Sequence, residues 1–232
     1  MLSRFWKIKV IKSYKNVHQV EGLTVVVDVL RAFTTCCFIF NNGAEKIIPV
    51  ADVEKAYQLI KSNPRFISIG ERNGLKLAGF NYGNSPAEIE NINMKGKTVI
   101  FTTSNGTQGL INVINADQVI TGAFVNAKAV VNYIRKLKPQ IVSFVVTNNN
   151  YKDNEDFMYV SYIKSCLNGK PINFERIKKH FINHPIAEFF LKKPMTEYSQ
   201  KDFYLSLELN KFNFVIGLKK EKDLIYLEKL AE

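Results

Sequence analysis

The 232-residue sequence has few cysteines and no long apolar runs, and these absences exclude several classes of protein. Its three cysteines include the adjacent Cys36 and Cys37 and form no CxxC pair, so neither a disulfide framework nor a cysteine-rich zinc site is predicted. No apolar stretch reaches the length of a transmembrane helix, and basic residues interrupt positions 1–20, which argues against a signal-peptide core. We therefore expect a soluble, cytoplasmic protein.

The sequence also lacks a concentrated basic stripe, although its net charge is +11, from 32 Lys and Arg against 21 Asp and Glu. The excess lies towards the two ends, since residues 21–130 are nearly balanced. No segment interleaves Arg with aromatic residues as RNA-binding motifs do. This distribution favours a solvated basic surface over nucleic-acid binding.

Short runs rich in Val, Ile and Phe alternate with stretches of helical periodicity as far as residue 167, which is the pattern of an α/β protein. The predicted strands are 5–11, 23–28, 46–50, 66–70, 98–102, 118–121 and 141–146, and the predicted helices are 31–41, 52–61, 108–114 and 126–136. Residues 168–232 are less typical, with helical patterns at 174–190 and 201–209 before a short strand at 212–216. We expect one domain over 1–232 with a C-terminal helical cover.

Two segments, beginning at Thr24 and Thr98, repeat one order of elements: strand, polar turn, helix, strand, turn, helix. This similarity of layout suggests a sheet built from two similar halves. Ligands of open α/β sheets bind at the carboxyl ends of strands, so a site is expected at residues 28–31, 102–107 and 147–156.

Asp28 follows three valines at the end of an apolar strand, where burial of an unpaired carboxylate costs on the order of several kcal/mol. Arg31, at the expected start of the next helix, is the nearest candidate partner. The two form either a structural ion pair or a magnesium-binding or nucleophilic Asp beside an anion-binding Arg. Their position at a strand end favours the functional interpretation.

The segment Thr102 to Thr107 (TTSNGT) consists of small and polar residues between a strand and a helix. Free backbone N–H groups, hydroxyl donors and Gly106 are what a phosphate or sulfonate oxygen needs, although a plain capping turn at Asn105 has the same composition. The segment is not a Walker loop, because GxxxxGK[ST] is absent.

Residues 70–86 form a long stretch with four glycines and several apolar residues, which is typical of an ordered loop at a site. Glu71 and Arg72 offer one acid and one base, and Asn84 and Ser85 offer donors beside a helix start at Pro86. Structural turns are the alternative interpretation.

Glu155 and Asp156 are adjacent carboxylates near a helix start, where acidic residues are also common for dipole reasons. Together with Asp28 they would make an oxygen-rich magnesium site. Cys36 and Cys37 are interpreted as core residues on an apolar helix face, and His180 and His184 as residues without a ligand role.

Taken together, the motifs resemble one family, the magnesium-dependent 2-phosphosulfolactate phosphatases. The matching strings are VVVDVLRAFTT at 25–35, NGAEKIIPV at 42–50, GERNG at 70–74, GFNYGNSP at 79–86, FTTSNGT at 101–107, GAFVNAKAV at 122–130 and ED at 155–156. They cover about two thirds of the chain in the family's order. The resemblance implies a three-layer α/β/α sandwich with a mixed sheet. It also implies hydrolysis of 2-phosphosulfolactate to 3-sulfolactate and phosphate, a step of coenzyme M synthesis, with Mg²⁺ as cofactor.

The resemblance also implies roles for individual residues. Catalytic roles fall on Asp28, Arg31 and Glu71, substrate binding on Arg72, Asn84, Ser85, Thr102, Asn105, Gly106, Thr107 and Asn126, and metal binding on Asp28, Glu155 and Asp156. Four departures from the family pattern are Asn81 for the usual Asp, Ser104 and Phe33 for the usual Thr, and Asn148 to Asn150 for a loop containing glycine.

Three hypotheses follow. The first is hydrolysis of a small anionic phosphoester, by attack of Asp28 or of a metal-bound water oriented by Glu71. The second, motivated by Asn81 and the asparagine loop, is a non-catalytic relative that binds a phosphorylated or sulfonated metabolite. The third is a basic surface that meets RNA. An apolar edge strand near Phe5 is a candidate homodimer surface.

Overall fold

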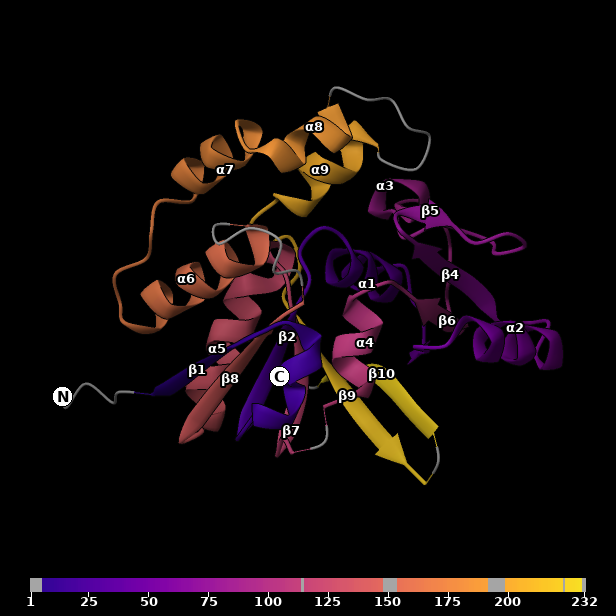
Figure 1. Ribbon diagram of the computed structural model, residues 1–232, viewed down its shortest axis with the longest axis horizontal. Helices are drawn as coiled ribbons and strands as arrows, with labels where there is room; N and C mark the ends of the chain where they lie inside the picture. Colours follow the sequence, from indigo (N-terminus) through magenta and orange to yellow (C-terminus); the bar gives the residue numbers. More distant parts are fainter. Residues whose placement is uncertain (1–5, 114, 148–153, 192–198, 223, 231–232) are drawn as a thin grey trace.

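A computed structural model describes residues 6–113, 115–147, 154–191, 199–222 and 224–230. Among them a ten-stranded, mostly parallel mixed sheet runs in the order β1-β8-β2-β7-β9-β10-β3-β6-β4-β5 (Figure 1). The strands are β1 (Lys7–Lys12), β2 (Leu23–Val27), β3 (Lys46–Pro49), β4 (Ile67–Arg72), β5 (Leu75–Lys76), β6 (Thr98–Thr102), β7 (Gln118–Gly122), β8 (Ile141–Val146), β9 (Val215–Glu221) and β10 (Leu224–Leu230). The α/β class and the mixed sheet are confirmed.

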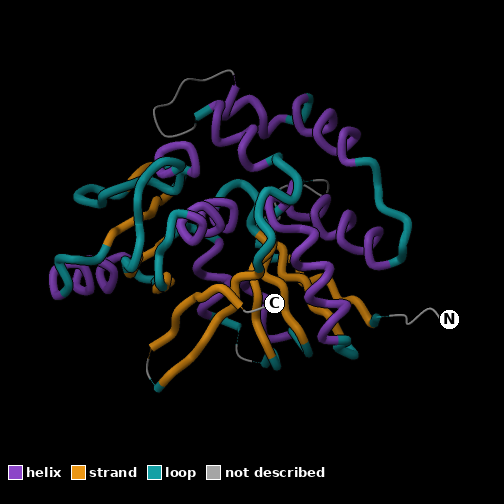
Figure 2. The backbone as a smooth tube through the Cα atoms, turned by 180° about the vertical axis from the view of Figure 1, so that it is seen from behind, coloured by secondary structure: helices purple, strands orange, loops and turns teal. Residues whose placement is uncertain are grey.

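The helices lie on both faces of the sheet, as Figure 2 shows from behind. They are α1 (Ala32–Asn41), α2 (Val53–Ser62), α3 (Pro86–Ile89), α4 (Gly106–Ile111), α5 (Ala127–Leu137), α6 (Glu155–Leu167), α7 (Phe174–Ile182), α8 (Pro185–Leu191) and α9 (Gln200–Ser206), with 3-10 turns η1 (Tyr14–Gln19) and η2 (Phe124–Asn126). The predicted core strands and helices are therefore present, with ends shifted by a few residues. Phe5, at the predicted start of the first strand, lies outside the described residues.

The sheet consists of two parallel halves joined by an antiparallel hairpin. Strands β1, β8, β2 and β7 form one half, and β3, β6 and β4 form the other, with β5 antiparallel to β4. The hairpin β9–β10 bridges them through Gly217, which pairs with Ile120, and Leu227, which pairs with Ile47.

The repeated layout predicted from the sequence is visible in the strand order. The first copy runs β2, α1, β3, α2, β4 and the second runs β6, α4, β7, α5, β8. In the sheet, β2 lies between β8 and β7, while β6 lies between β4 and β3. When β2, β3 and β4 are exchanged for their counterparts β6, β7 and β8, the strand order β8-β2-β7 becomes β4-β6-β3, which is the order observed in the other half. The first helix of each copy connects a strand of one half to a strand of the other half: α1 connects β2 to β3, and α4 connects β6 to β7. Helices α1 and α4 therefore lie between the halves (Figure 1).

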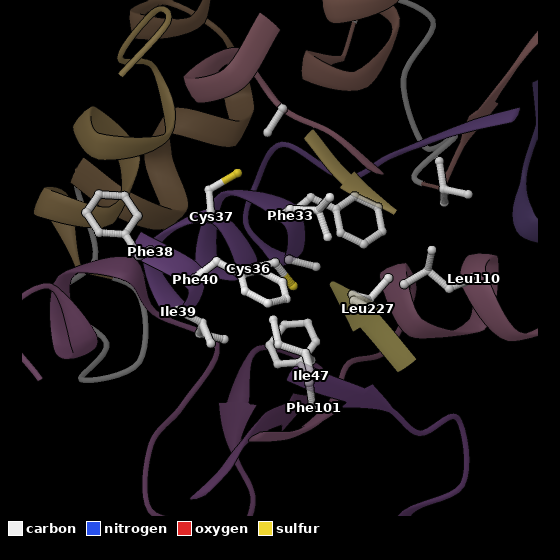
Figure 3. Close-up of a cluster of buried hydrophobic side chains, with 14 of the residues drawn as sticks. Phe33, Cys36, Cys37, Phe38, Ile39, Phe40, Ile47, Phe101, Leu110 and Leu227 are labelled. Atoms are coloured by element: carbon white, nitrogen blue, oxygen red, sulfur yellow. The ribbon is translucent and has the colours of Figure 1, made fainter. Parts of the chain in front are cut away.

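Helix α1 forms the centre of the core because its sequence is apolar on all sides. Every residue from Ala32 to Phe40 is buried, among side chains from both halves of the sheet (Figure 3). Strand β2 has two buried faces: Val26 joins the α1 cluster, whereas Val25 and Val27 pack in a second cluster with α5 and α6. The buried positions of Cys36 and Cys37 confirm them as core residues.

The C-terminal part corrects two predictions. The helical pattern at 174–190 is divided into α7 and α8, because Pro185 cannot continue a helix and begins the next one. The predicted strand at 212–216 is instead β9, and its partner β10 has no counterpart in the prediction. Both strands carry lysines on exposed positions, which hides their alternation in the sequence. Residues 168–232 thus supply two central strands as well as the helices α7, α8 and α9.

Candidate active site

Asp28 lies directly after β2, with 8% of its surface exposed. Its Oδ1 accepts a hydrogen bond from Ala32 N at 3.0 Å, and its Oδ2 accepts one from Thr147 Oγ1 at 3.2 Å. The pKa of Asp28 is raised from 3.8 to about 6, chiefly because burial disfavours the charged form and also because of the negative charge of Glu71, while these two hydrogen bonds and the charge of Arg31 act in the opposite direction. A buried carboxylate with a perturbed pKa at a strand end is a candidate functional residue.

Asp156, in the first turn of α6, lies close to the segment that contains Asp28. Its Oδ1 accepts from Val29 N at 2.9 Å, and its Oδ2 lies 3.4 Å from Thr147 Oγ1. Thr147 follows β8, the neighbour of β2, so its hydroxyl lies between the carboxylates of Asp28 and Asp156. Because one hydroxyl donates one hydrogen, it can serve only one of these two oxygens at a time. Glu155, the other predicted metal ligand, is also buried, at 1% exposure.

Arg31 precedes the first turn of α1 and is 4% exposed. Its Nη1 donates to Asp202 Oδ2 at 2.7 Å, and its Cζ lies 5.7 Å from the centre of the Phe190 ring. The partner expected from the sequence was Asp28, three residues away, and Arg31 does act on that carboxylate through its charge. Arg31 forms an ion pair, however, with Asp202 of α9.

The segment from Thr102 to Thr107 is an ordered turn at the start of α4. Thr107 N donates to Thr103 Oγ1 at 3.1 Å, and Thr103 N donates to Thr107 Oγ1 at 3.0 Å, so the two threonines cap the turn reciprocally. A Cβ added at Gly106 would lie 2.7 Å from Ala32 Cβ and 2.9 Å from Asp28 Oδ2. Only glycine allows α4 to approach Asp28 this closely. Its neighbour Asn105 is partly exposed.

Glu71, at the end of β4, forms hydrogen bonds with Ser104 of the 102–107 turn. Its carboxylate accepts from Ser104 N at 2.7 Å, from Ser104 Oγ at 2.9 Å and from Gly74 N at 2.7 Å. Arg72 Nη2 donates to Thr102 Oγ1 at 2.8 Å and to Ala51 O, and partial burial lowers the pKa of Arg72. The structure therefore brings Glu71 and Arg72 to the 102–107 turn, and their roles towards substrate stay predictions.

A cavity of about 430 Å³ lies beside Asn84 and Ser85 and is also lined by Lys76 and Ser199. Ser85 caps α3 by accepting from Glu88 N. Asn84 is 6% exposed, and its Oδ1 has no hydrogen-bond partner among the described residues. A buried carboxamide oxygen without a partner is uncommon in folded proteins, which indicates a place for a ligand or water.

Asn126 is not brought to this group by any hydrogen bond between described residues. Its Oδ1 accepts from Ala123 N at 3.2 Å, and its Nδ2 donates to Phe214 O at 3.4 Å, so it ties η2 to the segment before β9. Its predicted contact with substrate remains a prediction.

Two residues that bond to predicted site residues were not singled out in the sequence. Thr147 lies within the region expected to hold ligands but has no distinctive motif. Asp202 is fully buried and reads in the sequence as an ordinary acidic residue in the first turn of a helix capped by Ser199. Asn148 to Asn150 lie outside the described residues. No cluster of three or more His, Cys, Asp or Glu able to hold a metal occurs within the described ranges.

Comparison with known proteins gives a consistent result. The family model described as 2-phosphosulpholactate phosphatase matches residues 10–221. Similar proteins named "Probable 2-phosphosulfolactate phosphatase" occur in Clostridium novyi (35% identity; 62% of this chain and 61% of the relative), Carboxydothermus hydrogenoformans (41%; 63% and 61%) and Clostridium tetani (33%; 73% and 75%). The match thus spans about three fifths of the length of the first two relatives. In the part of the chain that the structure describes, no helix is long and apolar enough to cross a membrane.

Proposed function

The chain belongs to the 2-phosphosulpholactate phosphatase family, and we propose that it hydrolyses 2-phosphosulfolactate, or a similar small anionic phosphoester, to 3-sulfolactate and phosphate. One observation carries the proposal: the carboxylates of Asp28 and Asp156 converge on the Thr147 hydroxyl, and Gly106 of the 102–107 turn lies against Asp28. An acidic pair next to a glycine turn provides both halves of a phosphatase site. One half holds a cation and the other approaches a phosphoryl group.

The residues fit a magnesium ion, which we propose as the cofactor. Mg²⁺ prefers oxygen ligands and is commonly held by one or two carboxylates, with water and substrate phosphate completing the shell. Asp28 and Asp156 supply such carboxylates, with the Thr147 hydroxyl between them. Glu155 is the third ligand expected from the sequence, although the described residues form no cluster of three such ligands. When bound, the ion would neutralise phosphate oxygens and favour the ionised form of Asp28.

The phosphoryl end of the substrate would meet Arg31 and the 102–107 turn. Arg31 is buried, and its charge acts on Asp28, so an anion placed between the two would find a cation in a water-poor site. Because Gly106 has no side chain, the backbone of the turn lies directly against Asp28 Oδ2 and Ala32. The reciprocal bonds between Thr103 and Thr107 keep the turn in one conformation before substrate arrives.

The opposite end of the substrate would occupy the cavity beside Asn84. This cavity offers the Asn84 carboxamide N–H and the Lys76 ammonium as donors to a sulfonate or carboxylate, whereas the Ser85 hydroxyl already donates to Asp202 and shapes the wall of the cavity. The Oδ1 of Asn84 has no hydrogen-bond partner among the described residues, so this amide is not fixed by that atom, and its Nδ2 would be the donor to an anionic ligand. Substitution Asn84→Ala is expected to raise KM more than it lowers kcat.

The departure at Asn81 does not remove a carboxylate from this acidic pair. Asn81 Oδ1 accepts from Ser68 N at 2.8 Å and from Ser68 Oγ at 2.9 Å, so it fixes the loop to β4. An amide oxygen accepts these bonds as a carboxylate would. The structure of this loop therefore supports the catalytic hypothesis over a non-catalytic relative.

The decisive experiment measures phosphate release from 2-phosphosulfolactate with Mg²⁺ and with EDTA. We expect release that EDTA abolishes and added Mg²⁺ restores, and Asp28→Asn at background. Full activity in EDTA would refute the metal role. Tight binding of 3-sulfolactate by calorimetry without any phosphate release would instead favour the non-catalytic relative. Acid quenching during turnover, followed by mass spectrometry of the peptide containing Asp28, distinguishes attack by this carboxylate from attack by water.

A further inference from the structure

Asp202 is a fully buried carboxylate that has no part in the function proposed above. Its Oδ2 accepts from Arg31 Nη1 at 2.7 Å, and its Oδ1 accepts from Ser85 Oγ at 2.7 Å and from Ala87 N at 2.8 Å. Three donors from two elements thus converge on one side chain of α9. This side chain joins the start of α1 to the start of α3.

Stability alone gives little reason for this arrangement. A buried ion pair must recover the desolvation of both charges, and replacement by well-packed apolar residues is often neutral or stabilising. A charged hydrogen-bonded pair differs from an apolar contact in fixing direction, because each bond restricts the donor to a narrow range of angles. Asp202 and Arg31, at 0% and 4% side-chain exposure, therefore form a contact suited to orientation.

Arg31 is restrained from a second direction by the same part of the chain. The Phe190 ring of α8 lies 5.7 Å from the guanidinium carbon and 5.7 Å, centre to centre, from the Phe203 ring, which is next to Asp202 in α9. The two C-terminal helices thus hold the guanidinium by a carboxylate and by an aromatic ring.

We propose that Asp202 is a positioning residue, which aligns Arg31 for the phosphoryl group and, through Ser85 and Ala87 N, fixes the start of α3 and with it Asn84 at the opposite end of the substrate. This inference rests on the proposed function. It also gives the C-terminal helices a defined task. Because one carboxylate holds both donors, the spacing between the two ends of the binding site is set by Asp202.

The test compares Asp202→Asn, which removes the charge and presents an amide to Arg31, with Asp202→Glu, which keeps the charge but displaces it. We expect kcat/KM to fall about 100-fold in Asp202→Asn, as for other small misplacements of catalytic groups, and to fall less in Asp202→Glu. The matched control is Glu90→Gln, which breaks the exposed ion pair of Lys201 with Glu90 near the same helices without touching Arg31. This control is expected to stay within about twofold of wild type.

A double-mutant cycle separates positioning from general structural damage. In an Arg31→Met background, Asp202→Asn is expected to lower kcat/KM by less than about threefold further, because its effect passes largely through Arg31. An undiminished further loss in that background, or a single Asp202→Asn variant within threefold of wild type, would overturn the inference. If Asp202→Asn does not fold, Asp202→Glu is the test variant. The inference would then be overturned if Asp202→Glu has the kcat/KM of the wild type and, by calorimetry, the affinity of the wild type for inorganic phosphate. A wild-type chain without phosphate release would instead refute the proposed function itself.

Discussion

Removal of the charge of Asp28 is expected to stabilise the fold while abolishing activity. A pKa raised from 3.8 to about 6 means that the fold disfavours the ionised carboxylate by ~3 kcal/mol. The unfolding free energy of the wild type therefore decreases as the pH rises from about 4 through about 6, because Asp28 ionises. Above that range the whole contribution of ~3 kcal/mol from this group has been lost. Asn at this position stays neutral at every pH, and its amide can donate to Thr147 Oγ1 while that hydroxyl donates to Asp156.

The measurement is urea unfolding of the wild type and Asp28→Asn in EDTA, at pH values from about 4 to about 8. The two unfolding free energies are expected to agree near pH 4 and to differ by ~3 kcal/mol near pH 8, in favour of the variant. The matched control is Asp117→Asn, which changes an exposed carboxylate and should follow the wild type throughout. A variant that is less stable than wild type at pH 8, or a difference that does not change with pH, would refute the reasoning.

Three further predictions concern the turn and the cofactor. Gly106→Ala places a methyl group against Ala32 Cβ and Asp28 Oδ2, so we expect a loss of ~1–3 kcal/mol in unfolding free energy by urea titration. Wild-type stability and activity would contradict the close approach. Glu71→Gln keeps only one acceptor oxygen for the donors of Ser104 and Gly74, and thermal unfolding should show ~2 kcal/mol of lost stability; an unchanged Tm would count against that network. Magnesium should raise Tm in the wild type and not in Asp28→Asn, and an equal rise in both would place the ion elsewhere.

The central parts of the site could be predicted because their signals are local. An apolar strand such as β2 can be recognised from its valines, and the polar residue that follows it must lie at the edge of the sheet. The same reasoning found Asp156 and the 102–107 turn. It works because the carboxyl ends of neighbouring parallel strands lie together whatever the exact strand order is.

The parts that escaped prediction depend on contacts between distant segments. Asp202 meets Arg31 across 171 positions of sequence, and its own surroundings identify only the start of a helix. The hairpin β9–β10 escaped because its strands are half exposed and carry lysines, so that the alternation of apolar residues is short. Neither feature follows from local propensity, since each is decided by how the C-terminal part packs against the rest of the chain.

The two copies of the repeated layout place different residues at their equivalent strand ends. Asp28 follows β2 and the turn ending at Gly106 follows β6, and these strands occupy equivalent positions in the two halves of the sheet. The close approach of Gly106 to Ala32 shows that the starts of α4 and α1 pack against each other. The segments that follow β2 and β6 are therefore in contact: the first carries Asp28, and the second carries the 102–107 turn with Gly106. Under the proposed function the acid would hold the cation and the turn would receive the phosphoryl group, so the two copies would contribute different parts of one site.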